Sequence, residues 1–100
     1  MYRGTTPTHI FDVPIDTSTI KTVKITYSQN DVEVLVKRTE DCVITDGRIS
    51  TILSQEDTFL FDCTVVVDIQ VRVLTTDEVA MTSEPIKVRV GKCLDCEVLE

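Results

Sequence analysis

Four cysteines and one histidine are the residues of this 100-residue chain whose types are most suited to chemistry. Cys93 and Cys96 have the C-x-x-C spacing found in zinc knuckles and in thiol oxidoreductases. A structural zinc site needs four ligands, but the other cysteines, Cys42 and Cys63, stand alone in the sequence, and only His9 remains as a further ligand. A zinc or thiol protein built on the C-x-x-C pair is therefore an alternative and not the leading hypothesis.

The surroundings of the C-x-x-C pair argue against a redox role. Redox-active pairs sit at the start of a helix that follows a strand, where the helix terminus favours the thiolate. This pair instead follows the last predicted strand and lies in an acidic tail with Asp95, Glu97 and Glu100. We expect unpaired thiols there and small buried thiols at Cys42 and Cys63. A cross-strand disulfide between those two is the alternative in an oxidising compartment.

Other catalytic patterns are missing from the sequence, which has no G-x-S-x-G, P-loop or H-E-x-x-H motif. The adjacent carboxylates Glu40–Asp41 and Glu56–Asp57 would point to opposite faces of a strand, which disfavours a shared acid–base site. The segments DVPID and TTDEVAMTSE are rich in oxygen ligands but lack calcium-loop spacing. The prediction is a protein that is not an enzyme, with no catalytic, cofactor-binding or metal-binding residues and no small-molecule substrate.

Composition limits the partners and the compartment. The net charge is −7, from seventeen acidic and ten basic residues, and the basic residues are spread along the chain, so we expect no nucleic-acid partner. No apolar run approaches the roughly 20 residues of a membrane span, and the N-terminal residues lack the apolar core of a signal peptide. We expect no membrane association, no secretion by a signal peptide, and one domain over residues 1–100 with a loose acidic tail at 91–100.

Alternating apolar and polar residues predict two β-hairpins. The first pairs residues 21–28 with 32–39 through a turn at Gln29–Asp31, and places Leu35 on the polar face. The second pairs residues 64–75 with 86–90, with Pro85 at the start of its second strand. The residues predicted to face inward are Val23, Ile25, Tyr27, Val32, Val34, Val36, Val65, Val67, Ile69, Val71, Val73, Ile86, Val88 and Val90.

Shorter elements complete the prediction. Residues 8–13 and 48–53 read as further strands, the second after the turn signal Asp46–Gly47. Ser54 is expected to cap a single helical turn together with Asp57. Charged and amide side chains on alternate positions predict a solvated sheet face whose opposite charges pair across strands. The residues assigned to that face are Glu33, Lys37, Asp68, Gln70, Arg72, Lys87 and Arg89.

Six or seven short strands with antiparallel hairpins predict an all-β fold, an antiparallel two-layer β-sandwich of immunoglobulin-like architecture, with a small barrel as the alternative. The chain has no Trp, so the similarity to immunoglobulin domains concerns architecture alone. Leu35, Val66 and Leu74 fall on the polar side of their strands, and we expect them to be exposed for contacts between subunits.

Four segments carry a family resemblance: RGTTPTHIFDVPID, ITYSQNDVEVLVK, ILSQEDTFLFD and VDIQVRVLTTDEVAMTSEPIKVRV. Together they resemble a group of small proteins encoded in phage and prophage structural gene clusters of Gram-positive bacteria. They are similar, more distantly, to the N-terminal β-sandwich domain of phage baseplate upper proteins. The baseplate protein is longer, and neither its attachment role nor any of its functional residues is carried over to this chain.

The resemblance implies a non-enzymatic phage or prophage structural or assembly protein that works through protein–protein contacts, with the tail or baseplate as the candidate location. Its expected partners are other phage structural proteins or further copies of itself, with its location in the virion or in the host bacterial cytoplasm during assembly. A carbohydrate- or surface-binding β-sandwich module is an alternative, although two Tyr, three Phe and no Trp offer few platforms for stacking on sugar rings.

Overall fold

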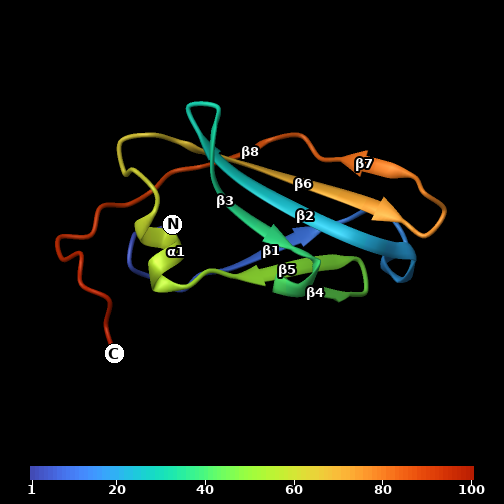
Figure 1. Ribbon diagram of the computed structural model, residues 1–100, viewed down its shortest axis with the longest axis horizontal. Helices are drawn as coiled ribbons and strands as arrows, with labels where there is room; N and C mark the ends of the chain where they lie inside the picture. The colour runs from blue at the N-terminus through green and yellow to red at the C-terminus, as the bar shows by residue number, and fades with distance from the viewer.

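The computed structural model describes residues 1–100 and shows eight strands in two antiparallel sheets that pack face to face. The molecule is flat, with extents of 46 × 30 × 16 Å. Figure 1 shows that helix α1 and both chain termini lie at one end of the sandwich. The predicted all-β, two-layer sandwich is confirmed, with one or two more strands than expected.

The strands are β1 Thr8–Asp12, β2 Ile20–Gln29, β3 Val32–Arg38, β4 Cys42–Thr45, β5 Arg48–Ile52, β6 Val67–Thr75, β7 Ala80–Thr82 and β8 Ile86–Val88. Two 3-10 turns, η1 at Thr17–Thr19 and η2 at Thr39–Asp41, join strands, and the α-helix α1 spans Gln55–Phe59. With five residues, α1 is the longest helix, so none could span a membrane.

The strand order is that of an immunoglobulin-like domain. A small sheet has the order β1-β5-β4, and a large sheet has the order β3-β2-β6, with β7 and β8 both paired to the far side of β6. These orders correspond to strands B-E-D and C′-C-F-G of the immunoglobulin fold. Strand A of that fold, which lies beside strand B, has no counterpart next to β1.

The first predicted hairpin is confirmed as β2 and β3. The backbone reverses at Asn30 and Asp31, whose φ angles of 51° and 61° are those of a type I′ turn. Both residue types tolerate the left-handed region because a short polar side chain forms local hydrogen bonds.

The face predicted for most of β3 was wrong. The register shifts between Tyr27 and Ser28, because β3 holds an extra residue, Val34, opposite that point. A bulge of one residue exchanges the two faces of the strand beyond it. Leu35 therefore lies opposite Tyr27 on the core side, and Val36 faces outward opposite Thr26.

The second hairpin was predicted in part. The stretch 67–75 forms β6, but residues 64–66 precede the strand, because the Asp62 carboxylate accepts hydrogen bonds from the Thr64 amide and hydroxyl and holds a turn. Residues 86–88 pair with β6 as predicted, whereas β7 was not predicted because it has only three residues inside a turn-like segment. Ile86, expected inside, is exposed.

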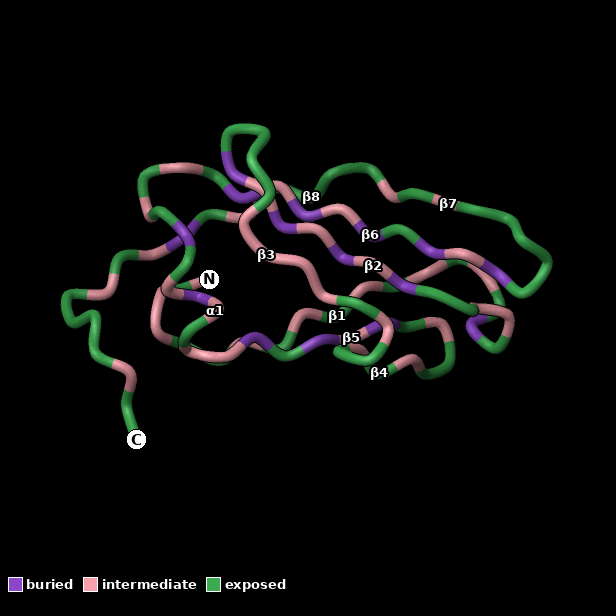
Figure 2. Tube along the Cα trace, viewed as in Figure 1, coloured by how far each residue is buried: buried purple, intermediate pink, exposed green.

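The core lies between β2 and β6 of the large sheet and β5 of the small sheet. Figure 2 shows buried and more exposed residues alternating along β2 and β6. The buried hydrophobic residues are Val23, Ile25, Tyr27, Ile49, Leu53, Phe61, Val67, Ile69, Val71, Val73 and Val90. Most come from the predicted inward faces, since alternation is the signature of a half-buried strand.

The cap of α1 is confirmed. The Ser54 hydroxyl accepts a hydrogen bond from the Asp57 amide at 3.0 Å, and the Asp57 carboxylate accepts one from the Ser54 amide at 3.0 Å. This capping box satisfies two backbone donors at the start of a helix of only five residues. The cap also fixes the direction in which the Asp57 carboxylate points.

Gln29, at the end of β2, holds the connection between α1 and β6. Its side-chain amide donates to the carbonyl oxygens of Asp62 and Val65 at 2.8 and 2.9 Å, and its oxygen accepts from the Asp62 amide at 2.9 Å. We expect Gln29→Ala to lower the free energy of unfolding by about 2 kcal/mol, because three partly buried backbone groups lose their hydrogen bonds. Urea unfolding measures this loss, and Gln70→Ala, which removes a single bond to the Ser83 carbonyl, should cost less than half as much.

Candidate interaction surface

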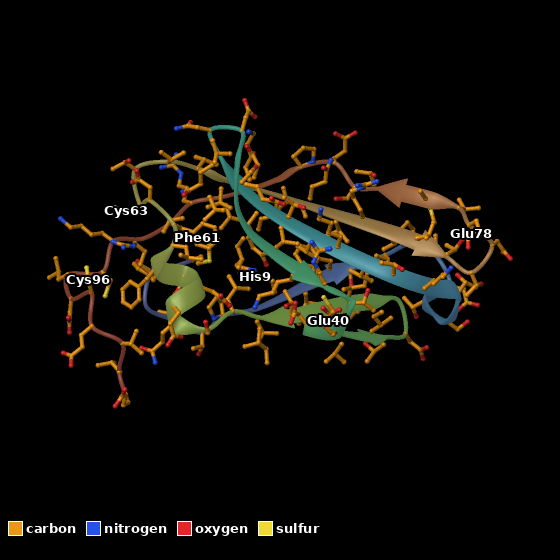
Figure 3. The ribbon with its side chains drawn as sticks, in the orientation of Figure 1. His9, Glu40, Phe61, Cys63, Glu78 and Cys96 are labelled. Atoms are coloured by element: carbon orange, nitrogen blue, oxygen red, sulfur yellow. The ribbon has the colours of Figure 1, made fainter.

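Cys93 and Cys96 lie in the C-terminal segment, beyond the last strand. The Cys93 thiol donates to the Asp95 carbonyl oxygen at 2.9 Å, and Cys96 is exposed near the α1 end of the molecule (Figure 3). The segment is attached to α1 through Gln55, whose side-chain amide exchanges two hydrogen bonds with the backbone of Leu99, at 2.7 and 2.9 Å. No group of three or more His, Cys, Asp or Glu side chains is placed to hold a metal ion.

Cys42 and Cys63 are both free thiols of intermediate exposure. Cys42 begins β4. Thr51 on β5 lies between Cys42 on β4 and His9 on β1, because it pairs with both. Burial raises the pKa of the Cys42 thiol, a shift that a hydrogen bond with Thr51 only partly offsets. The thiol is therefore held protonated at neutral pH, which makes it a poor nucleophile.

Tyr27 and His9 form a hydrogen-bonded pair between the sheets. The Tyr27 hydroxyl lies 2.7 Å from His9 Nδ1, and the rings stack with centroids 5.7 Å apart. Burial is the main cause of a raised pKa at Tyr27, to which the nearby Cys42 and Asp57 contribute. Burial, with a smaller contribution from the positive N-terminus, lowers the pKa of His9. Both groups are thus held neutral, and each gives the other a hydrogen-bond partner between the sheets.

We expect Tyr27→Phe to lower the free energy of unfolding by about 1 kcal/mol, because the ring packing is kept while the hydrogen bond to His9 is lost. Chemical unfolding of both proteins measures the difference. Tyr2→Phe is the matched control, because the Tyr2 side chain is largely exposed and should leave stability unchanged. Equal stability of Tyr27→Phe and the wild type would show that the His9 contact contributes nothing.

Lys37 belongs to the interior side and not to the solvated face for which it was predicted. It lies opposite Ile25 beyond the bulge, and its ammonium contacts the Asp57 carboxylate at 2.8 Å. Burial alone would raise the pKa of Asp57, but hydrogen bonds from Lys37 and Ser54 and the charge of Lys37 outweigh it and lower the pKa. The ion pair joins β3 of the large sheet to α1.

The outer face of the large sheet is charged, as predicted for most of its residues. Lys87 on β8 pairs with Asp68 on β6 at 3.0 Å, which confirms pairing across strands. Lys24 lies between Arg38 and Arg72 in one cross-strand row, so basic residues that are distant in the sequence are gathered here. Neighbouring like charges repel one another, so this row suits contact with an acidic group.

The outer face of the small sheet is different. Ile10, Val43 and Ile52 are exposed there by 59%, 61% and 64%. Ile10 and Val43 lie opposite Ser50 from its two sides, so they form one row across the three strands. The remaining outward residues are Thr8, Thr45 and the single ion pair Asp12–Arg48, at 3.1 Å. We call this surface the small-sheet outer face.

An apolar groove of about 590 Å³ continues from this face. It runs between β1 and the edge formed by β7 and β8, where the two sheets are not joined. Its apolar lining includes Ile10, Phe11, Val13, Val71, Met81 and Ile86. Ile10 belongs to both surfaces, so the groove and the small-sheet outer face meet at β1.

The apolar residues first suggested for subunit contacts are placed differently by the structure. Leu35 faces the core, and Leu74 is only half-buried on the outer side of β6, opposite Thr22. Val66 is exposed as expected. The exposure of Ile10, Val43 and Ile52 was not predicted from the sequence. A signal for this apolar surface was present in the sequence: the outward positions 43, 45, 50 and 52 carry no charged residue, and only Arg48 does.

No family model, no curated protein and no solved structure matches the chain.

Proposed function

We propose that the protein is a non-enzymatic structural or assembly protein of a phage or prophage, in the tail or baseplate, that acts through protein–protein contacts. The observation that carries the proposal is the small-sheet outer face, where three large aliphatic side chains are exposed. Grouped exposed apolar side chains are a mark of interaction sites, whereas single ones are ordinary. The resemblance of four sequence segments to phage structural proteins supplies the biological setting.

The charge of the chain adds support. With a net charge of −7, two acidic molecules repel each other over most of their surfaces. The small-sheet outer face carries only Asp12 and Arg48, which cancel each other. A partner that docks there meets apolar side chains with no net charge to desolvate. The proposed locations are the virion and, during assembly, the cytoplasm of the host bacterium.

Quantitative mass spectrometry of purified particles from the source strain tests this proposal. We expect the protein at a fixed ratio to the tail subunits, and the ratio gives its copy number. A strain that carries Ile52→Lys, which places a charge on the small-sheet outer face, should lose the protein from particles or lose intact particles.

The control for that strain is Lys87→Glu, which changes charge on the large sheet, and it should incorporate normally. Absence of the wild-type protein both from particles and from assembly intermediates that contain the other tail subunits would contradict the proposal.

A further inference from the structure

The free side of β1 presents a row of unpaired backbone groups. At the two ends of the ladder with β5, the Leu53 amide donates to the Pro7 carbonyl at 3.0 Å and the Val13 amide donates to the Gly47 carbonyl at 2.8 Å. In an antiparallel pair, residues alternate between those that bond to the neighbour and those whose N–H and C=O point away. The backbone groups of Thr8, Ile10 and Asp12 therefore point to the free side.

The other strand edges of the sandwich carry features that block pairing with a second sheet. The β3 edge has a bulge and the charged residues Glu33 and Arg38, and β4 has only four residues. The edge beyond β6 is divided between β7 and β8, with Pro85 directly before β8. Bulges, charges, short strands and proline are the usual protections of an edge.

The β1 edge has neither a bulge nor a proline within its length. Its five residues pair with β5 in unbroken register, and Pro7 and Pro14 lie outside the strand. The charged outward side chain, Asp12, stands at one end, and the centre is Ile10, which is 59% exposed. On this side β1 pairs with no other strand, and the apolar groove lies beside it.

We propose that two copies of the chain associate by antiparallel pairing of β1 with β1 about a two-fold axis at Ile10. The strand is complementary to itself in this register. Ile10 meets Ile10 of the second copy, and Thr8, a hydroxyl donor, meets the carboxylate of Asp12. The two small sheets then form one six-stranded sheet whose outer surface joins both small-sheet outer faces. This inference goes beyond the proposed function: it adds a second copy bound at β1 and leaves the joined small-sheet outer faces open to the other subunits.

The dimer is expected to be weak and to depend on salt. A five-residue strand pair buries less area than the roughly 1,600 Å² of a standard interface, so association in the micromolar to millimolar range is expected. Each copy carries a net charge of −7, and salt screens the repulsion between them. Association should therefore strengthen when the salt concentration is raised.

Sedimentation equilibrium of the purified full chain tests the pairing, at concentrations from about 10 µM to 1 mM. We expect a shift from the 11.2 kDa monomer towards twice that mass. Ile10→Lys should weaken association at least tenfold, because two ammonium groups then meet on the axis. Ile52→Lys is the matched control: it makes the same change at an equally exposed isoleucine of the same face, but on the central strand β5, and it should still dimerise.

A mixture of Ile10→Lys and Ile10→Glu chains gives a sharper result. Only a contact that places residue 10 against residue 10 restores association in the mixture while each variant alone stays monomeric. If Ile52→Lys prevents association as strongly as Ile10→Lys, the contact lies on the small-sheet outer face and the β1 pairing is wrong. The β1 pairing is also wrong if the mixture stays monomeric.

Amide hydrogen exchange of the wild type provides a test that does not depend on any variant folding. The amides of Ile10 and Asp12 should become at least tenfold better protected at high protein concentration, while those of His9 and Phe11 are protected throughout. A monomer at millimolar concentration with unprotected Ile10 overturns the inference. Its failure leaves the particle experiment unaffected, because the protein can enter particles through other subunits.

Discussion

Replacing Phe61 with alanine is expected to lower the free energy of unfolding by about 3–5 kcal/mol. Phe61 is 1% exposed, and its ring centroid lies 5.8 Å from that of Tyr27. It follows α1 in the segment that leads to β6, so its side chain anchors the crossing between the two sheets. Removing the ring loses buried apolar area and leaves a cavity that the rigid sheets on either side cannot close.

Urea unfolding followed by circular dichroism measures this effect. A domain of this size has a total stability of roughly 5–15 kcal/mol, so the variant should unfold at a much lower urea concentration. Leu60→Ala is the control, because it removes a neighbouring side chain that is 56% exposed and should change stability by less than about 0.5 kcal/mol. Similar losses in both variants would mean that Phe61 is not part of the core.

Replacing Asp57 with alanine has the second large expected effect, a loss of about 2–3 kcal/mol. The substitution removes the partner of the largely buried Lys37 ammonium and the acceptor for the Ser54 amide. Both side chains of the ion pair retain some solvent contact, so the loss is smaller than for a fully buried pair. Glu56→Ala, at the adjacent helix position, is the control and should cost little.

A double variant separates the ion pair from the cap. The double variant Lys37→Met/Asp57→Ala should lose less stability than the sum of the two single losses. Each single variant leaves one partly buried charge without its partner, whereas the double variant leaves none. Additive losses would show that the two side chains do not interact. Chemical unfolding of the four proteins provides the cycle.

The pH dependence of stability provides an independent check on Asp57. Its folded-state pKa is lowered below 3.8, so the folded state binds this proton less readily than the unfolded chain. The stabilising contribution is complete above the unfolded value and is lost as the pH falls through the folded value. Asp57→Asn should therefore lose less stability than the wild type between about pH 5 and pH 2. Parallel pH profiles would exclude the contribution.

Much of the fold could be read from the sequence because alternation at period 2 shows directly which side of a strand is buried. Ile25 and Tyr27 on β2, and Ile69 and Val71 on β6, were predicted on the correct face. The turn and cap signals at Asn30–Asp31 and Ser54 also worked, because they depend on local hydrogen bonds and backbone angles. The sheet order was not predictable, because strand pairing depends on residues far apart in the chain.

The tertiary structure decided the features that carry the proposals. A bulge at Val34 moved Leu35 and Lys37 to the core side, and pairing between distant strands produced the Lys37–Asp57 ion pair. Ile10 likewise lies at an open edge only because β1 has β5 on one side and no strand on the other. The sequence alone determined the alternation of each strand and hence a two-layer β-protein, because burial of a strand face is a local pattern. The interaction surface is a property of the assembled sheets, because an edge exists only once the order of the strands is known.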